Sequence, residues 1–487
     1  MVKKRNFLFF FISALVAVLI FVVIFLITSE NILQSPGNKE VSINGIGSSL
    51  EKTNVQLKGS LAIIIIDDFE NRISETVYYI QIEESDGLKE YQLIFKKGKE
   101  PGGISGQEID AIGKLEGEKF FVEEYNLYTP LKDPNINIGA IGVQKTAVIL
   151  YNDRTHKDER LTKEEVWHKV FNLSYNQSIN SYIKEISYNK TWLEGDVFGV
   201  YTLPCDARKR DPPCYSGGWE GREAIMDIAD PDIYFPNYSR IIAIPVNICC
   251  VGFSTIGKSI VQTEDGRVFL SYLKVGWADI DRGTGSHEFG HSLGVMHAND
   301  YECGEKVVED NCETLEYGDG FDQMGQCFDI KHCGHFNPVH KEFLGFFDNF
   351  TLMKIEDDGI YRIVPYELLS NNLQVLKIPV TYILNWHENS SYFYLYYRQP
   401  IGFDSRYSNL SGVMINIDST LVYYGRRDGK SRLLDFSPHS DNEVPQREDS
   451  NDVVLRKGER YVNDRYGFSI EVLEENGEYA EVSIQGL

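Results

Sequence analysis

The segment GSHEFGHSLGVMHAND at residues 285–300 constrains this chain more than any other, because its histidines have the spacing of a metal site. His287 and His291 stand four residues apart, so on an α-helix both side chains project from one face and can hold one ion. Gly294 can adopt a left-handed conformation that ends the helix, which lets the chain turn back and bring His297 to the same ion. The spacing therefore predicts a helix, a turn and a three-histidine metal site.

Three neutral imidazoles leave one position of tetrahedral zinc open, which is the arrangement of a catalytic rather than a structural site. Such an ion activates water and polarises a carbonyl, and Glu288 is placed to take the water's proton and pass it to the leaving amine. The predicted chemistry is peptide-bond hydrolysis with one catalytic Zn²⁺. The alternative is an amphipathic helix whose Phe289, Leu293 and Val295 pack in a core while the histidines face solvent. The match at all five motif positions makes this alternative the weaker one.

The pattern His-Glu-x-x-His-x-x-Gly-x-x-His at 287–297 resembles the signature of the metzincin zinc metalloproteases. The resemblance implies a Met-turn downstream, and YGDGFDQMGQC at 317–327 supplies Met324. By analogy Met324 forms a hydrophobic floor beneath the three histidines and does not bind the ion. Some metzincins place a tyrosine two residues after this methionine to assist the oxyanion, but the residue here is Gln326, so that role is not assigned.

Further segments are similar to the gametolysin-like endopeptidases, and the likeness covers roughly 145–487 with a weaker extension into 55–140. It implies a sheet-and-helix upper subdomain, the active-site helix, and a lower subdomain after Gly294. The substrate would lie extended between the subdomains and pair with an edge strand within 253–263. The segments are KTAVILYNDR (145–154), LEGDVFGVYTLP (193–204), EYGDGFDQMG (316–325), HFNPVHKEFLGF (335–346), YLYYRQPIGFD (394–404) and LLDFSP (433–438).

An unbroken apolar run at 7–27 follows three basic residues, and it is long enough to cross a bilayer as one helix. The sequence predicts an uncleaved transmembrane signal-anchor, with a removed signal peptide as the alternative. The basic segment 1–6 would stay in the cytoplasm and the remainder would lie outside. The expected location is the cell membrane, single-pass, or the exterior if the segment is cleaved.

The cysteines agree with export, since all eight lie between Cys205 and Cys333 and disulfides are their expected fate. Seven Asn-x-Ser/Thr triplets suit a glycosylated surface, although such triplets also arise by chance. Histidines at 332, 335 and 340 lie near two cysteines, but a disulfide is favoured there over a second zinc site. The simplest local pairs are Cys303 with Cys312 and Cys327 with Cys333.

The formal net charge of −24 disfavours nucleic acid as a partner, because an acidic surface repels phosphate backbones. A protein or peptide substrate and, through the N-terminal helix, the membrane are the expected partners. Calcium is possible but unsupported, since no EF-hand pattern accompanies the acidic residues near the histidine motif. These are Asp281, Asp300, Asp319 and Asp322.

The expected fold class is α+β/α/β: a metzincin-type catalytic domain at 141–349 between two β modules. Strand-like runs and an Asp-Gly turn predict an N-terminal β module at 55–140, a possible pro- or accessory domain, after a stalk at 28–54. Thr162 with Glu165 predicts a capped helix, and further strands predict a C-terminal β-sandwich-like domain at 350–487. Strands are also predicted at 61–66, 76–82 and 240–246. Turn residues predict a hairpin at 264–266, between strands at 259–263 and 268–273, and another at 476–477, between strands at 468–473 and 479–484. The predicted function is an extracellular, membrane-anchored zinc endopeptidase. The alternative is a non-catalytic cell-surface binding or adhesion protein built on the same domain.

Overall fold

The computed structural model describes residues 54–487 except 70, 86, 129–138, 156–160, 206–218, 220, 247–251, 282, 305, 310–311, 326–333, 385–386, 408–409, 419–429 and 438–452. Asn54–Leu487 forms one compact unit. Within the described residues no helix is long and apolar enough to cross a membrane. The segments 1–6 and 7–27, on which the sequence predicts a cytoplasmic end and a membrane anchor, lie outside the described residues.

The α+β/α/β class expected from the sequence is wrong, because the fold is mostly β, with 47% strand and 16% helix. The α-helices of the described part are short, between 6 and 10 residues. The strands of 55–128 join the same sheet as those of 142–275.

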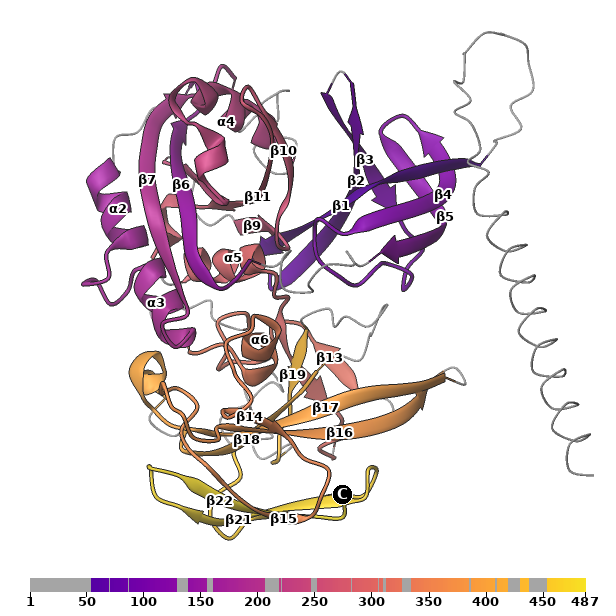
Figure 1. Ribbon diagram of the computed structural model, residues 1–487, viewed down its shortest axis with the longest axis vertical. Coiled ribbons are helices and arrows are strands. Elements are labelled where there is room, and N and C mark those ends of the chain that lie inside the picture. Colours follow the sequence, from indigo (N-terminus) through magenta and orange to yellow (C-terminus); the bar gives the residue numbers. More distant parts are fainter. Residues whose placement is uncertain are drawn as a thin grey trace, which may run out of the picture. The chain divides into compact units, whose positions relative to one another are not determined.

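The largest sheet has eleven strands, and one half of it carries the helices (Figure 1). In that half the strands β7, β6, β8 and β11 are parallel neighbours, and β9 and β10 both pair with β11 antiparallel. The continuous apolar run in β6 and β8 reflects burial on both faces. The bounds are β6 Gly142–Asn152, β7 Thr191–Thr202, β8 Arg240–Pro245, β9 Gly252–Thr255, β10 Ser259–Thr263 and β11 Gly266–Val275.

The other half of this sheet is formed by the first five strands of the described chain. The long strand β1 pairs antiparallel with β2, with β4 and, through residues 64–67, with β9, so it joins the two halves. Alternation along β1 places Ile63 and Ile65 on one face and Ile64 on the other, in two different apolar clusters. The bounds are β1 Val55–Asp68, β2 Ile73–Glu84, β3 Gly87–Ile94, β4 Glu108–Glu116 and β5 Lys119–Tyr128.

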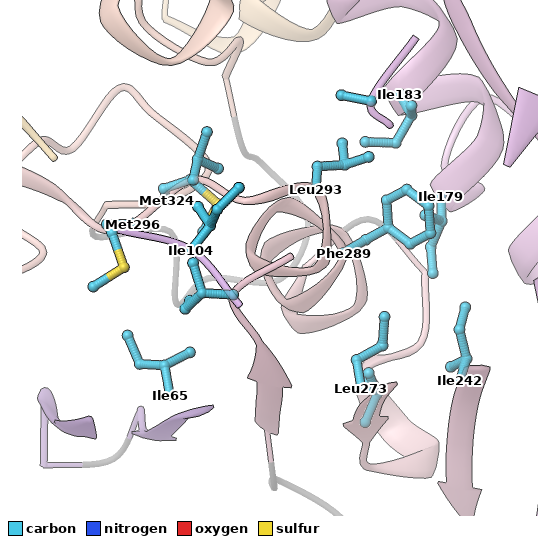
Figure 2. Close-up of a cluster of buried hydrophobic side chains, with 14 of the residues drawn as sticks. Ile65, Ile104, Ile179, Ile183, Ile242, Leu273, Phe289, Leu293, Met296 and Met324 are labelled. Atoms are coloured by element: carbon cyan, nitrogen blue, oxygen red, sulfur yellow. The ribbon is translucent and has the colours of Figure 1, made fainter. Parts of the chain in front are cut away.

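Helix α5 (Thr284–Leu293) packs against β9, β11 and α3. Its Phe289 and Leu293 point toward Ile179 and Ile183 of α3, and Leu273 of β11 lies nearby (Figure 2). All of these side chains are fully buried. These apolar contacts are made by the face of α5 that does not carry the histidines. The other helices are α2 (Lys163–Phe171), α3 (Ile179–Ile186), α4 (Gly221–Ala229) and α6 (Pro338–Phe343).

Several local predictions are confirmed. Thr162 and Glu165 form the capping box of α2. The hairpin predicted around 264–266 joins β10 and β11, and the turn at Gly477 joins β21 (Phe468–Glu475) and β22 (Ala480–Gln485). Cys303 and Cys312 form a disulfide, whereas the pair Cys327 and Cys333 lies outside the described residues.

Two smaller sheets contain the remaining strands of the described residues. The seven-stranded sheet has the order β13-β12-β19-β18-β17-β16-β14, and the four-stranded sheet has the order β15-β22-β21-β20. The chain passes from α5 through Gly294 and His297 directly into β12, so the histidine motif leads into the seven-stranded sheet. The bounds are β12 Ala298–Glu302, β13 Glu313–Leu315, β14 Leu352–Lys354, β15 Gly359–Ile363, β16 Val375–Leu384, β17 His387–Arg398, β18 Gly412–Asp418, β19 Ser431–Leu433 and β20 Arg460–Asn463.

Candidate metal centre

The structure brings the three histidines of the motif together. His287 and His291 lie one turn apart on α5 and are both buried. Gly294 ends the helix with φ of 116°, a left-handed conformation that strains residues with a side chain. The chain then reverses, so that Nε2 of His297 lies 3.1 Å from Nε2 of His291.

A fourth potential ligand comes from β1, far from the motif in sequence. The carboxylate of Asp67 is buried among the histidines, and its Oδ2 lies 3.3 Å from Nε2 of His287 and 3.4 Å from Nε2 of His291. Its Oδ1 lies 3.3 Å from Nε2 of His297. One ligand atom from each of the four residues lies within 4.8 Å of the others, so this buried group of one aspartate and three histidines could hold a metal ion.

The hydrogen bond of Nδ1 fixes the orientation of each histidine ring. Nδ1 of His287 donates to the carbonyl oxygen of Gln323 (2.9 Å) and Nδ1 of His291 to that of Val295 (2.8 Å). Nδ1 of His297 donates to the carboxylate of Glu316 (2.9 Å). Because an oxygen acceptor requires the proton on Nδ1, we assign the lone pair of each neutral ring to Nε2, which faces the centre.

This arrangement fits a cation. Nitrogen lone pairs that face each other at 3.1 Å beside a carboxylate repel one another, and a positive ion between them removes the repulsion. Oδ2 of Asp67 and Nε2 of His287 are buried and make no hydrogen bond among the described residues. Ligand atoms of a tetrahedral zinc site with bonds of about 2.0–2.1 Å lie about 3.3–3.4 Å apart. The three Asp–His separations of 3.3, 3.4 and 3.3 Å agree with that geometry.

The charges of the four groups are coupled. Burial opposes ionisation of Asp67, but His297, His287 and His291 together hold the pKa of its carboxyl well below the usual range. Burial lowers the pKa of His291 to about 4, which favours the neutral ring that metals bind. Burial also acts to lower the pKa of His297, but the neighbouring carboxylates of Asp67 and Glu316 raise it overall.

Glu288 also lies at this centre, next to the start of β9. Its two carboxylate oxygens are buried and make no hydrogen bond among the described residues, and the carboxylate of Asp67 lies nearby. Burial first, and then the charge of Asp67, raise the pKa of Glu288 well above its usual value. Gly252 makes room for this side chain, since a Cβ there would lie 2.0 Å from Oε1 of Glu288.

Met324 lies beneath the helix that carries the histidines. A Cβ on Gly290 would lie 2.4 Å from its sulfur, so the glycine lets Met324 pack directly against α5. The carbonyl oxygen of Met324 accepts from the backbone N–H of Ala298 (2.9 Å), and the preceding residue, Gln323, supports His287. Met324 is fully buried and lies near Met296 and Ile104 (Figure 2).

Three residues at the centre were not anticipated from the sequence: Asp67, Glu316 and Tyr317. The hydroxyl of Tyr317 donates to Oδ1 of Asp67 (2.6 Å), and its ring centroid lies 4.0 Å from that of His297. Glu316 and Tyr317 stand within a segment quoted for its likeness to gametolysin-like enzymes, but no motif marks them. The one sequence signal at Asp67 is that an acidic residue directly follows the apolar run 61–66 of β1.

Of the other acidic and histidine residues considered as ligands, His332 lies outside the described residues, and several others have partners away from this centre. Asp281 pairs with Lys169, and Asp322 pairs with His340 (3.0 Å). Asp319 accepts from Asn416. His335 contacts Glu185 (3.0 Å). Within the described residues, the group of Asp67 and the three histidines is the one in which ligand atoms converge.

Comparison of the chain with models of known protein families and with curated protein sequences finds no match. The resemblance to metzincins therefore depends on the sequence motifs alone.

Proposed function

We propose that this protein is a zinc-dependent endopeptidase with Glu288 as its general base. The observation that carries the proposal is the placement of Glu288 on the same helix as His287 and His291, beside the carboxylate of Asp67 on which the three histidine Nε2 atoms converge. The donor set of three imidazoles and one carboxylate suits zinc better than calcium, which prefers six to eight oxygen ligands. His287, His291 and His297 would hold the ion.

A bound zinc ion would supply a Lewis acid that polarises the scissile carbonyl and makes water more acidic. Glu288 takes a proton from the attacking water while the oxygen of that water bonds to the carbonyl carbon. The same carboxyl then gives this proton to the leaving nitrogen as the C–N bond breaks, so one water is consumed and one acid and one amine are formed. The buried setting of Glu288 excludes bulk water from this transfer.

Tyr317 would assist at the carbonyl oxygen. Its hydroxyl already donates to a carboxylate oxygen at the centre, 2.6 Å away, so it can donate equally to an oxygen that gains negative charge during the reaction. Gln326, which takes the place of the tyrosine found in some metzincins, lies outside the described residues. Tyr317 is therefore the hydroxyl that the described site offers for this role.

A second function has one observation in its favour. With Asp67, the centre offers four protein ligands to a metal ion, and zinc sites with four protein ligands are usually structural rather than catalytic. On that view the protein is a binding or adhesion protein whose metal holds β1 against α5. Such a protein would contain zinc and hydrolyse no peptide in any form.

The test compares the chain, its Asp67→Ala variant and a form cut by a sequence-specific protease at a site inserted between β5 and β6. Each is assayed for zinc by atomic absorption and for cleavage of a broad library of quenched peptides. We expect cleavage in at least one form, and Glu288→Gln in that form should lower it about 10²–10⁴-fold while zinc content stays near one per chain. Zinc-loaded, folded protein that cleaves nothing in all three forms would contradict the proposal.

A further inference from the structure

We propose that the disulfide between Cys303 and Cys312 positions Glu316 and Tyr317 at the metal centre, so that its reduction weakens zinc binding while the rest of the chain stays folded. This inference concerns regulation of the proposed peptidase site and rests on that proposed function. It follows from the place of the disulfide along the chain, because one short strand joins each cysteine to residues at the metal centre.

The disulfide and the metal centre lie at opposite ends of one hairpin. β12 begins directly after His297 and ends directly before Cys303. β13 begins directly after Cys312 and ends directly before Glu316 and Tyr317. The two strands run antiparallel, and beyond the paired residues Nδ1 of His297 donates to the carboxylate of Glu316 (2.9 Å). The covalent bond therefore closes the end of the hairpin that is opposite to the histidine.

Of the two strands, β13 is held by fewer contacts. It lies at the edge of the seven-stranded sheet, where β12 is its only partner among the described strands, through three residue pairs. Its side chains are exposed or partly exposed, so little apolar burial holds it in place. β12 pairs on its other side with β19, and its first three residues are buried. Opening the disulfide should therefore release β13 and leave β12, with His297, where it is.

The loop that the disulfide closes is accessible to a reductant and has a second attachment. The cross-link joins residues 9 apart, so it removes conformational freedom that this loop would otherwise have. Cys303 and Cys312 are both partly exposed, so a small reductant can reach them. Val307 and Val308 of the same loop pack against the apolar cluster formed by the two smaller sheets. That contact remains after reduction, so we expect a local release of β13 and not unfolding of the domain.

Release of β13 would remove support from one histidine of the three. Glu316 is the oxygen acceptor for Nδ1 of His297, and the ring centroid of Tyr317 lies 4.0 Å from that of His297. The acceptors for the other two rings, the carbonyl oxygens of Gln323 and Val295, lie outside the hairpin. Loss of such a partner typically lowers metal affinity about 10–100-fold. Two rings keep their orientation, so the expected result is weaker binding and not loss of the site.

Other contacts limit the size of this effect. The hydroxyl of Ser74 on β2 donates to Glu316 (2.6 Å), and the backbone N–H of Tyr317 donates to the side chain of Asn299 (3.2 Å). These bonds hold Glu316 and Tyr317 themselves, but not the part of β13 that leads to the disulfide. The reduced chain should therefore sample both the arrangement seen here and a released one. We expect the loss of zinc affinity to be about 10-fold, at the lower end of the range for such partners.

Reduction is carried out with a phosphine, because thiol reductants bind zinc themselves. The S–S bond breaks, the phosphorus is oxidised and takes the oxygen of one water molecule, and the two hydrogens of that water end on the two thiols. A variant with both cysteines replaced by alanine needs no reductant. It also separates this disulfide from any other, such as the one that includes Cys205.

The positioning role is tested by zinc affinity, measured by competition with a chromophoric chelator. The proteins are the parent, the parent reduced by phosphine, the Cys303→Ala/Cys312→Ala double variant and the control Lys306→Ala, an exposed residue of the same loop. Zinc should bind the reduced parent and the double variant about 10-fold more weakly than the oxidised parent. The phosphine should not change the double variant further, and Lys306→Ala should match the parent.

Three outcomes of this comparison would overturn the inference. The first is equal zinc affinity with and without the disulfide. The second is a fall in the reduced parent alone, which would assign the effect to another disulfide. The third is loss of the circular dichroism of the fold both in the reduced parent and in the double variant, because the disulfide would then be a general stabiliser.

A cycle with Glu316→Ala shows whether the disulfide acts through this residue. If it does, replacing both cysteines should cost little further zinc affinity when residue 316 is already alanine. An equal loss in both backgrounds would refute the positioning role. Peptide cleavage that persists alongside that result would leave the peptidase intact. A parent that binds no zinc would instead reject the proposed function, and this inference with it.

Discussion

Gly252 and Glu288 are in such close contact that neither position tolerates a larger neighbour. The first residue of β9 lies against the carboxylate of Glu288, and even a methyl group there would come within 2.0 Å of Oε1 and 2.8 Å of the ring of Phe69. The ladder between β1 and β9 fixes the backbone of Gly252, so the side chain would have to move. The position of the proposed base thus depends on a glycine outside the histidine motif.

Gly252→Ala is therefore expected to displace Glu288 and reduce catalysis without removing the metal. In the active form, kcat should fall about 10-fold or more, because a small misplacement of a catalytic group is costly. Zinc content should stay near that of the parent, since the atoms nearest to the added Cβ belong to Glu288 and Phe69 and not to a histidine. Gln262→Ala, at an exposed position of β10 in the same sheet, is the control. An unchanged kcat in Gly252→Ala would show that Glu288 is not held by this contact.

Gly290 and Met324 form a second close pair, and here a double-mutant cycle is informative. Gly290→Ala places a Cβ 2.4 Å from the sulfur of Met324, so overpacking should cost about 1–3 kcal/mol in the free energy of unfolding. Met324→Ala alone should cost about 2–5 kcal/mol through the cavity it leaves. The double variant removes the clash, so its cost should be less than the sum of the two. Urea unfolding of all four proteins measures this, and strict additivity would contradict the packing described here.

Glu316 should tune metal affinity although it does not face the metal position. It accepts from Nδ1 of His297 (2.9 Å) and from the hydroxyl of Ser74 on β2 (2.6 Å). Glu316→Ala leaves the imidazole without its partner, so zinc affinity should fall about 10–100-fold, as for other partners of metal-bound histidines. In Glu316→Gln the zinc affinity should fall less, because an acceptor oxygen remains. Competition with a zinc chelator measures the effect, and Glu313→Ala, an exposed residue on β13, is the control.

The part of the site that could be predicted from sequence is the part encoded locally. The spacing of His287, His291 and Gly294 follows from helix geometry and from the freedom of glycine, and neither requires knowledge of the fold. The same holds for the capping box of α2 and for the hairpin of β10 and β11. Asp67 could not be found in this way, because its role depends on β1 pairing with β9, and no sequence pattern specifies which distant strands pair.

The prediction of the fold class was wrong for a related reason. Periodicity placed many strands correctly, including β1, β2 and β8, but it cannot show that two groups of strands share a sheet. The strands of 55–128 look complete on their own, with an Asp-Gly turn and no metal ligand pattern. Their apolar residues nevertheless belong to the same clusters as those of α5 and β8. The shared core was therefore invisible in the sequence.

Asp300 should make the stability of the protein fall as pH rises. Burial raises the pKa of its carboxyl from 3.8 to about 8, and Glu302, Asp319 and Asp435 add to the shift. A folded pKa above the unfolded one means that the folded state holds the proton more tightly. This contribution is therefore complete below pH 4 and is lost progressively as pH rises to about 8, with a slope of about 1.4 kcal/mol per pH unit for one proton.

Asp300→Asn removes this titration but keeps an oxygen for the amide of Tyr301, which donates to Oδ1 at 2.8 Å. Relative to the parent, the variant should gain stability steadily between pH 5 and pH 8. Urea unfolding midpoints of both proteins in the presence of a chelator measure this difference, because histidine protonation and zinc binding otherwise obscure it. Asp265→Asn, in the exposed turn between β10 and β11, is the control and should show no such trend. If the difference between parent and Asp300→Asn is the same at every pH, Asp300 does not hold its proton in the folded protein.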